Sequence, residues 1–403
     1  MNKENHNPAN EIQDTQFFGE FGGVNPSISD SSTYTFLTAK AMSDTFEGKG
    51  EGCYLYSRHS SPSNLYLADV LARMENTEAA HVTASGMAAI TAVIMQLCNN
   101  QDHVVSSRTI YGGTYAFLKN MAPKFGIQTS FVDITKLDLV EAAITPNTKI
   151  IYCETVSNPL LEVADLEALS ALCKKYNLKL VVDNTFTPLL ITPIKFGADV
   201  VIHSLTKYIN GSSDCVGGVI CATTDFINAL KDVNDGSCML LGATMDSLRA
   251  TSILKNLRTL PIRMKQHSYN ANYLANEFSK NGIKVVYPGL TQHPSHQIFN
   301  KLINPEYGNG GMLTIDLGSL ENANQVMEDM QKDNIGYLAV SLGFYKTLFS
   351  APGSSTSSEI PLDEQKEMGL TNGLIRFSIG LDHDIKRTNQ KIMKCIEKSL
   401  QPA

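Results

Sequence analysis

Two ionisable side chains stand directly after short apolar runs that are typical of buried strands. The run from Lys179 to Val182 is followed by Asp183, and a run ending at Ile202 is followed by His-Ser-Leu-Thr and Lys207. A lysine behind a buried strand can lose its proton, and the neutral amine can form a Schiff base. A buried aspartate can accept a hydrogen bond from a protonated ring nitrogen. Either residue could instead serve the fold alone, as a cap of the sheet end or of a helix.

Two short turns bring hydroxyl and glycine residues to predicted helix starts. Ser85-Gly86-Met87 opens a helix expected over 87–97, and Tyr111-Gly-Gly-Thr follows a strand expected over 103–106. Free N–H groups at a helix start suit a phosphate, although an ordinary helix cap has the same composition. The chain contains neither GxGxxG after a strand nor GxxxxGK[ST], which speaks against an NAD-dependent oxidoreductase and a P-loop NTPase.

A lysine, an aspartate one strand away and a phosphate-binding turn are together the parts of a pyridoxal 5′-phosphate (PLP) site. The carboxyl ends of parallel strands meet at one edge of a sheet, where ligands of α/β proteins bind. The sequence therefore predicts that Asp183 and Lys207 lie close together at such an edge.

The region around these residues alternates between short apolar runs and amphipathic segments. Such alternation predicts a mostly parallel sheet with helices on both faces. Strands are expected over 103–106, 129–132, 149–153, 179–182, 199–202 and 217–221, and helices over 64–74, 87–97, 116–124, 137–143, 165–176 and 225–231.

The C-terminal part differs, since one long helical pattern there precedes widely spaced strands. We expect one helix over 248–281, strands over 284–287, 311–316 and 374–379, and helices over 321–332 and from 384. The predicted organisation is an N-terminal arm (1–60) that contacts a neighbouring subunit, a PLP-binding α/β domain (61–255) and a smaller α+β domain (256–403).

The amino-acid composition of the chain limits the classes of molecule that it is expected to bind and the compartment in which it is expected to lie. The chain has 403 residues, with 33 Lys plus Arg against 40 Asp plus Glu, and this net charge of −7 disfavours nucleic acid and anionic membranes. Eight scattered cysteines without a CxxC pair indicate reduced thiols, and the polar N-terminus lacks the apolar core of a signal peptide, so a cytoplasmic location is expected. No metal site is expected, because His293-x-x-His296 lies in a proline-containing loop without nearby cysteine.

Six motifs in order along the chain carry a resemblance to a known family. They are YSRHSSPS (56–63), ASGMAAI (84–90), YGGT (111–114), VVDNTF (181–186), HSLTKY (203–208) and LIRFSIG (374–380). With them the chain resembles the Cys/Met-metabolism family of fold-type I PLP enzymes from about residue 18 onward. The resemblance implies a large cofactor domain, a smaller C-terminal domain and an extended N-terminal arm.

The resemblance also implies roles for single residues of the cofactor site. PLP would be bound covalently to Lys207, with Asp183 at its pyridine nitrogen and Asn158 at its 3-oxygen. The implied phosphate ligands are Ser85, Gly86, Met87, Ser204 and Thr206. Tyr56 and Arg58 match positions that reach across a dimer interface to the phosphate of the neighbouring subunit, so two chains would share each active site.

For the substrate site, the resemblance implies that Ser341 and Arg376 hold the carboxylate of a small sulfur amino acid, with Tyr56 and Gly113 nearby. An arginine suits this task because its planar fork binds both carboxylate oxygens. Tyr111 would stack on the PLP ring and protonate the leaving group, while Lys207 would move protons between substrate atoms.

Within the family, segments 18–28, 238–245 and 339–360 resemble plant-type methionine γ-lyases, which implies α,γ-elimination of L-methionine to methanethiol, 2-oxobutanoate and ammonia. Gly113 stands where many bacterial relatives have a cysteine. Cystathionine γ-lyase, cystathionine γ-synthase and O-acetylhomoserine sulfhydrylase activities therefore stay open. Shared active sites imply dimers, which are expected to pair as a homotetramer. A degenerate, non-enzymatic relative would lack Lys207, Asp183 or Arg376, and all three are present.

Overall fold

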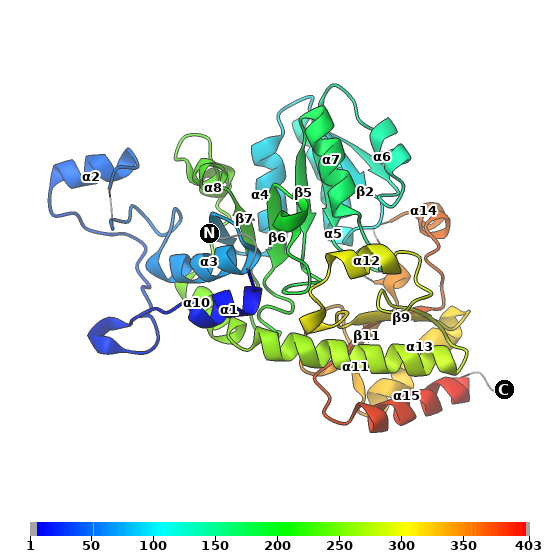
Figure 1. The fold of residues 1–403 in the computed structure, drawn as a ribbon. Coiled ribbons are helices and arrows are strands. Elements are labelled where there is room, and N and C mark those ends of the chain that lie inside the picture. Colours follow the sequence, from blue (N-terminus) through cyan, green and yellow to red (C-terminus); the bar gives the residue numbers. More distant parts are fainter. Residues whose placement is uncertain (1–5, 51, 356, 359, 400–403) are drawn as a thin grey trace.

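The computed structural model describes residues 6–50, 52–355, 357–358 and 360–399, and places them around two β-sheets (Figure 1). The larger sheet has the strand order β1-β7-β6-β5-β4-β2-β3, in which β6 to β3 run parallel and the β7 and β1 pairings are antiparallel. Its strands are β1 (Ala79–Thr83), β2 (His103–Ser107), β3 (Gln128–Val132), β4 (Thr148–Glu154), β5 (Lys179–Asp183), β6 (Val200–Ser204) and β7 (Gly218–Ala222). The mostly parallel sheet confirms the predicted fold class.

Strand β1 is the one strand of this sheet that the sequence pattern missed. Its residues, Ala-Ala-His-Val-Thr, include two alanines and a histidine, which have little preference for strands. The segment becomes a strand at the sheet edge because it pairs along its whole length with β7. Tertiary pairing, rather than local propensity, decides its conformation.

Helices cover both faces of the larger sheet, and the alternation of strand side chains shows why. Val181 and Val182 are neighbours in β5, yet Val182 packs in a core with α3, α7 and α10, and Val181 packs in another with α4, α5, α8 and α9. The helices are α3 (Pro62–Glu75), α4 (Gly86–Leu97), α5 (Gly112–Ala116), α6 (Leu137–Ala142), α7 (Leu166–Tyr176), α8 (Thr224–Lys231), α9 (Ser237–Leu241) and α10 (Ser247–Leu257).

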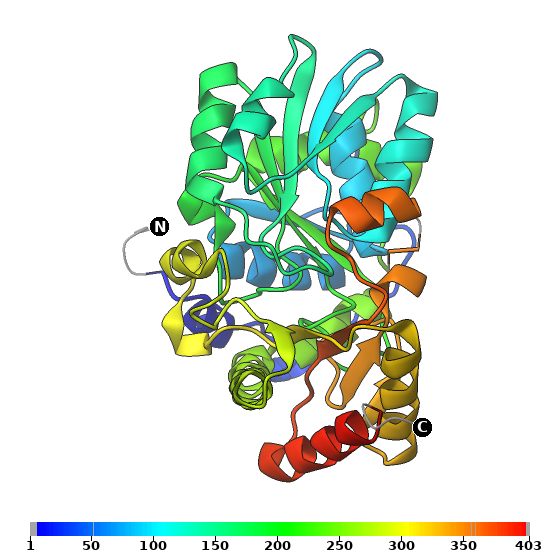
Figure 2. The same ribbon diagram turned by 90° about the vertical axis from the view of Figure 1, so that its right-hand side faces the viewer.

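The second sheet belongs to the C-terminal part of the chain. It has the order β10-β11-β12-β9-β8, and its core includes side chains from α11, α13 and α15. Figure 2 shows these helices in the lower half of the molecule. The elements are α11 (Leu260–Lys280), β8 (Lys284–Val286), α12 (His296–Leu302), β9 (Met312–Asp316), α13 (Leu320–Lys332), β10 (Gly336–Leu338), β11 (Thr347–Ser350), α14 (Leu362–Glu367), β12 (Leu374–Ser378) and α15 (Ile385–Ser399). The short strands β10 and β11 and the helices α12 and α14 were not predicted.

Two predicted helices are interrupted, each near a proline. The single helix expected over 248–281 is instead α10 and α11, because Pro261 lacks the amide that would continue the hydrogen-bond ladder of α10. The helix expected over 116–124 consists of α5, a π-helical turn at Phe117–Met121 and a 3₁₀ turn at Ala122–Phe125, with Pro123 in the last. Both predictions of continuous helices were wrong.

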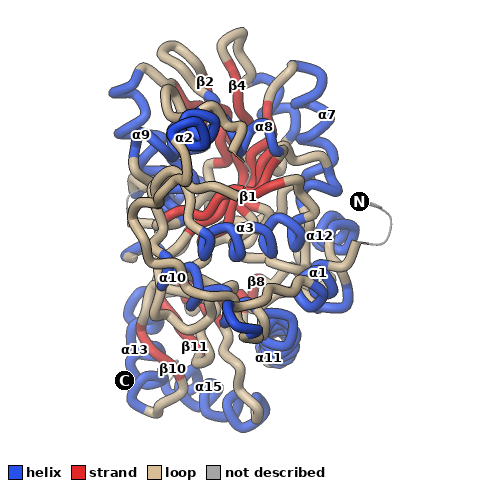
Figure 3. The backbone as a smooth tube through the Cα atoms, turned by 90° about the vertical axis from the view of Figure 1, so that its left-hand side faces the viewer, coloured by secondary structure: helices blue, strands red, loops and turns tan. Residues whose placement is uncertain are grey.

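The N-terminal residues divide into a packed and a projecting part. Helix α1 (Pro8–Asp14), which was not predicted, is capped by Asn7 and packs on α3 through the buried Ile12. Helix α2 (Ala39–Phe46) projects from the body in Figure 1, and Figure 3 shows it from another side. The predicted domain boundaries after residues 60 and 255 stay a prediction. Within the described ranges, no helix is both long and apolar enough to cross a membrane.

Candidate active site

The carboxyl ends of β4, β5 and β6 and the start of α4 surround a cavity of about 230 Å³. Residues of the C-terminal part, including Arg376 of β12, close its other side. The predicted site residues that line it are Ser85, Gly86, Met87, Tyr111, Asn158, Asp183, Ser204, Thr206, Lys207 and Arg376. The structure thus brings most of the predicted site together.

Lys207 lies three residues after the end of β6, in the turn that the strand-end pattern predicted. Its Nζ donates a hydrogen bond to Ser341 Oγ over 3.2 Å. Burial, helped by the charge of Arg376, lowers the pKa of Lys207 to about 8. The neutral form of this amine, which is the form that attacks carbonyl groups, is therefore far more populated near neutral pH than in an ordinary lysine.

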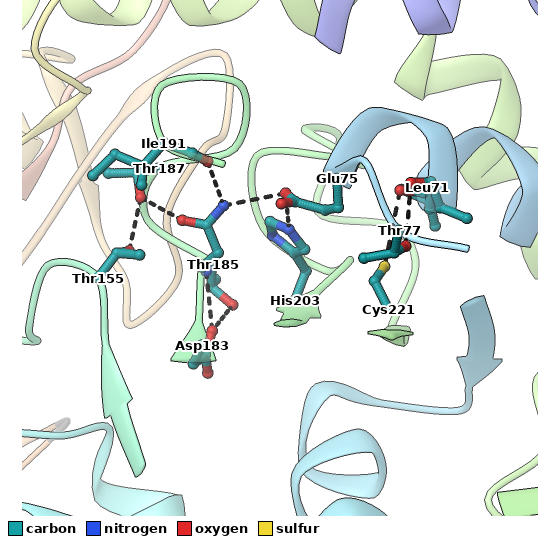
Figure 4. Close-up of polar contacts among 12 residues, drawn as sticks. Leu71, Glu75, Thr77, Thr155, Asp183, Thr185, Thr187, Ile191, His203 and Cys221 are labelled. Carbon is teal, nitrogen blue, oxygen red and sulfur yellow. Dashed lines mark hydrogen bonds and ion pairs between the residues drawn. The ribbon is translucent and has the colours of Figure 1, made fainter. Parts of the chain in front are cut away.

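Asp183 is the last residue of β5 and is buried. Its Oδ1 accepts hydrogen bonds from the Thr185 amide at 3.0 Å and from Thr185 Oγ1 at 2.5 Å (Figure 4). Burial raises the pKa of Asp183, and the Thr185 hydrogen bonds and the charge of His203 act in the opposite direction. A cationic ring nitrogen in the cavity would stabilise this carboxylate further.

The Ser85 turn has the geometry of an anion site. Ser85 caps α4, with its Oγ accepting from the Ala88 amide, and the first amides of the helix, on Gly86 and Met87, remain available to a ligand. A Cβ on Gly86 would lie 2.8 Å from the Cβ of Ser204, so only glycine allows α4 to approach β6 this closely. Helix start and strand end therefore form one cradle.

Glu154, the last residue of β4, connects two predicted site residues. Its two carboxylate oxygens accept hydrogen bonds from the backbone amides of Tyr111, at 2.7 Å, and Asn158, at 2.8 Å. Burial and the neighbouring Asp183 raise the pKa of Glu154 well above its usual range. Gly113 lies beside this tyrosine, since a Cβ there would come 2.6 Å from a ring carbon of Tyr111.

Arg376 of β12 is buried and reaches the cavity from the second sheet. Its Nη1 donates to Asn158 Oδ1 over 3.0 Å and its Nη2 to the Ser341 carbonyl over 3.4 Å. Among the described residues, its Nε has no hydrogen-bond partner. Burial lowers the pKa of Arg376 to about 10, so the group still carries a charge near neutral pH and can bind an anion.

Tyr56 and Arg58 do not line this cavity. Tyr56 is 45% exposed, and Arg58 Nη1 donates to the Met239 carbonyl at 2.6 Å. The guanidinium carbon of Arg58 stands 5.9 Å from the ring centre of Tyr56. Both side chains therefore lie outside the cavity of their own chain.

Several lining residues were missed by the sequence analysis. Glu154 directly follows the strand predicted over 149–153 and is the last residue of β4, so reading the residues that follow predicted strands, which found Asp183, would have found it too. The others are the hydroxyl residue Thr185 and an apolar set, which includes Ile90, Val156, Phe186, Val216, Val340 and Leu342. No chemical pattern in the sequence marks these apolar residues, because they resemble ordinary core positions.

Comparison with known proteins places this geometry in a family. The profile described as "Cys/Met metabolism PLP-dependent enzyme" matches residues 10–388. The chain belongs to this family. A methionine γ-lyase of Arabidopsis thaliana is 43% identical over 369 residues, covering 90% of this chain and 84% of that protein. A cystathionine γ-lyase of Bacillus subtilis is 39% identical, over 82% of this chain and 85% of that protein.

Comparison with solved structures leads to the same family. A structure described as O-acetylhomoserine (thiol)-lyase of Campylobacter jejuni, which carries an N′-pyridoxyl-lysine-5′-monophosphate, has a TM-score of 0.90 and 30% identity, covering 97% of this chain and all of that one. The chain is therefore a PLP-dependent Cys/Met metabolism enzyme, related to carbon–sulfur lyases. The buried aspartate, the half-buried lysine and the glycine cradle at α4 fit this cofactor.

Proposed function

We propose that this Cys/Met metabolism enzyme catalyses the α,γ-elimination of L-methionine to methanethiol, 2-oxobutanoate and ammonia. The observation that carries the proposal is the apolar lining around Lys207 and Arg376, formed in part by Val216, Val340 and Leu342. A methyl thioether gains from such surroundings. A second amino-acid group at the end of the substrate, as in cystathionine, would leave its charges without partners there. The 43% identity to a methionine γ-lyase supports the same choice.

The cofactor assignment follows the residues that fit PLP. Lys207 would carry it covalently, Asp183 would pair with the pyridine nitrogen, and Asn158 would contact the 3-oxygen. The phosphate would lie at the start of α4, against Ser85, Gly86, Met87, Ser204 and Thr206. When bound, PLP delocalises the electron pair that a departing Cα proton leaves behind.

The substrate carboxylate is assigned to Arg376, which is charged, buried and close to Lys207 through Ser341. Asn158 orients the guanidinium by accepting from Nη1. An anchored carboxylate fixes the Cα–H bond relative to Lys207 Nζ, which removes much of the entropic cost of reaching a reactive arrangement.

Lys207 and Tyr111 would divide the proton transfers. Lys207 Nζ takes the Cα proton and later moves protons at Cβ, because a pKa of about 8 allows the amine both to accept and to return a proton near neutral pH. The Tyr111 hydroxyl donates a proton to the thioether sulfur, so that methanethiol rather than its anion leaves. Water then completes the release of 2-oxobutanoate and ammonia.

A shared active site is proposed as well, in dimers that pair into a homotetramer. Tyr56 and Arg58 lie outside the cavity of their own chain, and the N-terminal segment presents Phe18, Phe21, Val24 and Leu37 to solvent in the isolated chain. Apolar patches of this kind are typical of interfaces. In this arrangement Tyr56 and Arg58 would complete the phosphate site of the neighbouring subunit.

The deciding experiment offers methionine, cystathionine, homocysteine and O-acetylhomoserine with sulfide in parallel, and measures 2-oxobutanoate and volatile thiol. We expect methionine to yield both products. Release of oxo acid from cystathionine but not from methionine would assign the enzyme to cystathionine lysis. Formation of homocysteine from O-acetylhomoserine, without oxo acid from methionine, would assign it to γ-replacement.

A further inference from the structure

Strands β5 and β6 are joined at their carboxyl ends by side chains on both faces of the sheet. On the cavity face, Thr185 makes the connection. Its Oγ1 donates to Asp183 Oδ1 at 2.5 Å and accepts from the Ser204 amide at 2.8 Å. One hydroxyl thus connects the proposed partner of the ring nitrogen to a proposed phosphate ligand.

On the opposite face, a buried carboxylate makes a second connection between the same strands. Glu75, the last residue of α3, accepts at Oε1 from Asn184 Nδ2 over 3.1 Å and lies 2.7 Å from His203 Nε2 (Figure 4). Asn184 directly follows Asp183, and His203 directly precedes Ser204. The carboxylate therefore joins the two residues that stand next to the proposed PLP ligands.

The network continues beyond the two strands. Asn184 Nδ2 also donates to the Ile191 carbonyl at 2.8 Å, and its Oδ1 accepts from Thr187 Oγ1 at 2.6 Å. Thr187 Oγ1 lies 2.7 Å from Thr155 Oγ1, directly after β4 (Figure 4). Asn184 thereby fixes the turn that follows β5 in one orientation.

An ionisable pair is an unusual choice at this depth. Glu75, Asn184 and His203 are each at most 1% exposed to solvent. One residue pair deeper on the same face, Val182 and Val201 pack in the apolar core. Well-packed apolar side chains often stabilise a fold as well as a buried polar pair does, so stability is a weak explanation for Glu75 and His203 at this depth.

We propose that Glu75 is a positioning residue for the cofactor: by bridging Asn184 and His203 from behind the sheet, it fixes the separation and orientation of Asp183 and Ser204. The PLP ring is planar and its phosphate is joined to it by only a short CH₂–O linker, so the ring nitrogen and the phosphate can both bind well only within a narrow range of separations between these two side chains. The inference rests on the proposed roles of Asp183 and Ser204 in binding PLP.

The test uses the full-length enzyme and PLP alone. Glu75→Leu removes the bridge and fills its space, and Glu75→Gln keeps an acceptor for both partners. We expect Glu75→Leu to fold and to bind PLP about tenfold more weakly, an effect of the size that outer-shell changes have on metal affinity. It should also lose much of the visible circular dichroism of the bound cofactor, because the cofactor is held less firmly in one orientation. Glu75→Gln should restore most of the affinity and the signal. With methionine, kcat of Glu75→Leu should fall while KM changes little.

Thr77→Val is the matched control, because it removes a buried hydroxyl just after α3 whose partners are backbone carbonyls outside the network. It should keep wild-type affinity and dichroism. Should Glu75→Leu not fold, Glu75→Asp decides, since the shorter carboxylate cannot reach both partners and should give the same losses. Wild-type affinity and dichroism in the folded Leu or Asp variant, or equal losses in Thr77→Val, would overturn the proposal. These readouts need no substrate, so a different substrate preference leaves them unchanged, and wild-type protein that binds no PLP would contradict the proposed function instead.

Discussion

The carboxyl edge of the larger sheet and the N-terminal arm differ in how fully their side chains are buried and hydrogen-bonded within a single chain. At the edge, Glu154, Asp183 and Asn184 are all buried and hydrogen-bonded within the chain. In the arm, Phe21 is 99% exposed and Leu37 is fully exposed. Exposed aromatic and aliphatic side chains of this size are costly in water. The first region is thus held in place by contacts within one chain, and the second has the surface of an unfinished interface.

The two regions therefore differ in whether their proposed role in the reaction needs a second chain. The proposed Schiff-base lysine, Lys207, and the proposed carboxylate ligand, Arg376, come from one chain and are held by contacts inside it. The proposed contribution of Tyr56 and Arg58 depends on a second chain. A substitution at the edge should therefore impair the active site of the chain that carries it. A substitution of Tyr56 or Arg58 should instead impair the site of the neighbouring chain, and an unmutated neighbour should leave the substituted chain's own site intact.

The largest effect is expected from Lys207→Ala. The variant has no amine to bind PLP covalently or to move the Cα proton, so turnover should be lost and the visible absorbance band of the cofactor should disappear. Absorbance spectra and a 2-oxobutanoate assay measure both outcomes. Lys174→Ala, which removes an exposed lysine of α7, is the control. An unchanged visible band in purified Lys207→Ala would refute the assignment of this lysine.

Arg376→Leu should have the next largest effect, a fall of about 100-fold in kcat/KM for methionine. The value corresponds to the loss of about 3 kcal/mol from a charge-assisted pair of hydrogen bonds. Most of the change should appear in KM, which steady-state kinetics resolve, and Arg376→Lys should recover part of it. Arg387→Leu, at an exposed position of α15, should leave the kinetics unchanged. A normal KM in Arg376→Leu would place the carboxylate elsewhere.

The edge was largely predictable from sequence because strand ends converge by a general rule. Asp183, Ser204 and Lys207 follow apolar runs, and the parallel strands place them together. Arg376 was different, since it comes from the other sheet, and only the resemblance of its motif to a known family identified it. The glycine of the Ser85 turn was also found, but its reason, the close approach of α4 to Ser204, is visible only in three dimensions.

The remainder depends on contacts that no local pattern encodes. Strand β1 forms because β7 is beside it, and the apolar cavity lining looks like ordinary core in the sequence. Glu75, which bridges Asn184 and His203 behind the sheet, is more than a hundred positions away from either of them in the sequence. Helix α1 is an instructive exception, since Asn7 followed by Pro8 is a capping signal that the sequence analysis did not use.

Val340→Glu tests whether the apolar lining sets substrate choice within the edge. A carboxylate beside Ser341 could pair with the distal ammonium group of cystathionine and would disfavour a methyl thioether. We expect the ratio of kcat/KM for methionine to that for cystathionine to fall about tenfold, equivalent to one favourable charge contact. Leu338→Glu, on β10 outside the cavity lining, controls for added charge. An unchanged ratio would remove Val340 from the specificity determinants.

The smallest effect, and the sharpest test of the comparison, comes from mixing subunits. Lys207→Ala should be inactive in its own cavity, and Arg58→Ala should be impaired in the cavity of its neighbour. In a dimer with one chain of each kind, one site combines the intact Lys207 of one chain with the intact Arg58 of the other.

Random re-association after denaturation should therefore restore about a quarter of the wild-type activity, since half of the dimers are mixed and one of the two sites in each mixed dimer is intact. The same procedure applied to either variant alone supplies the baseline. Activity that stays at the baseline would mean that Arg58 serves its own chain, and the arm would then need another explanation for its exposed apolar side chains.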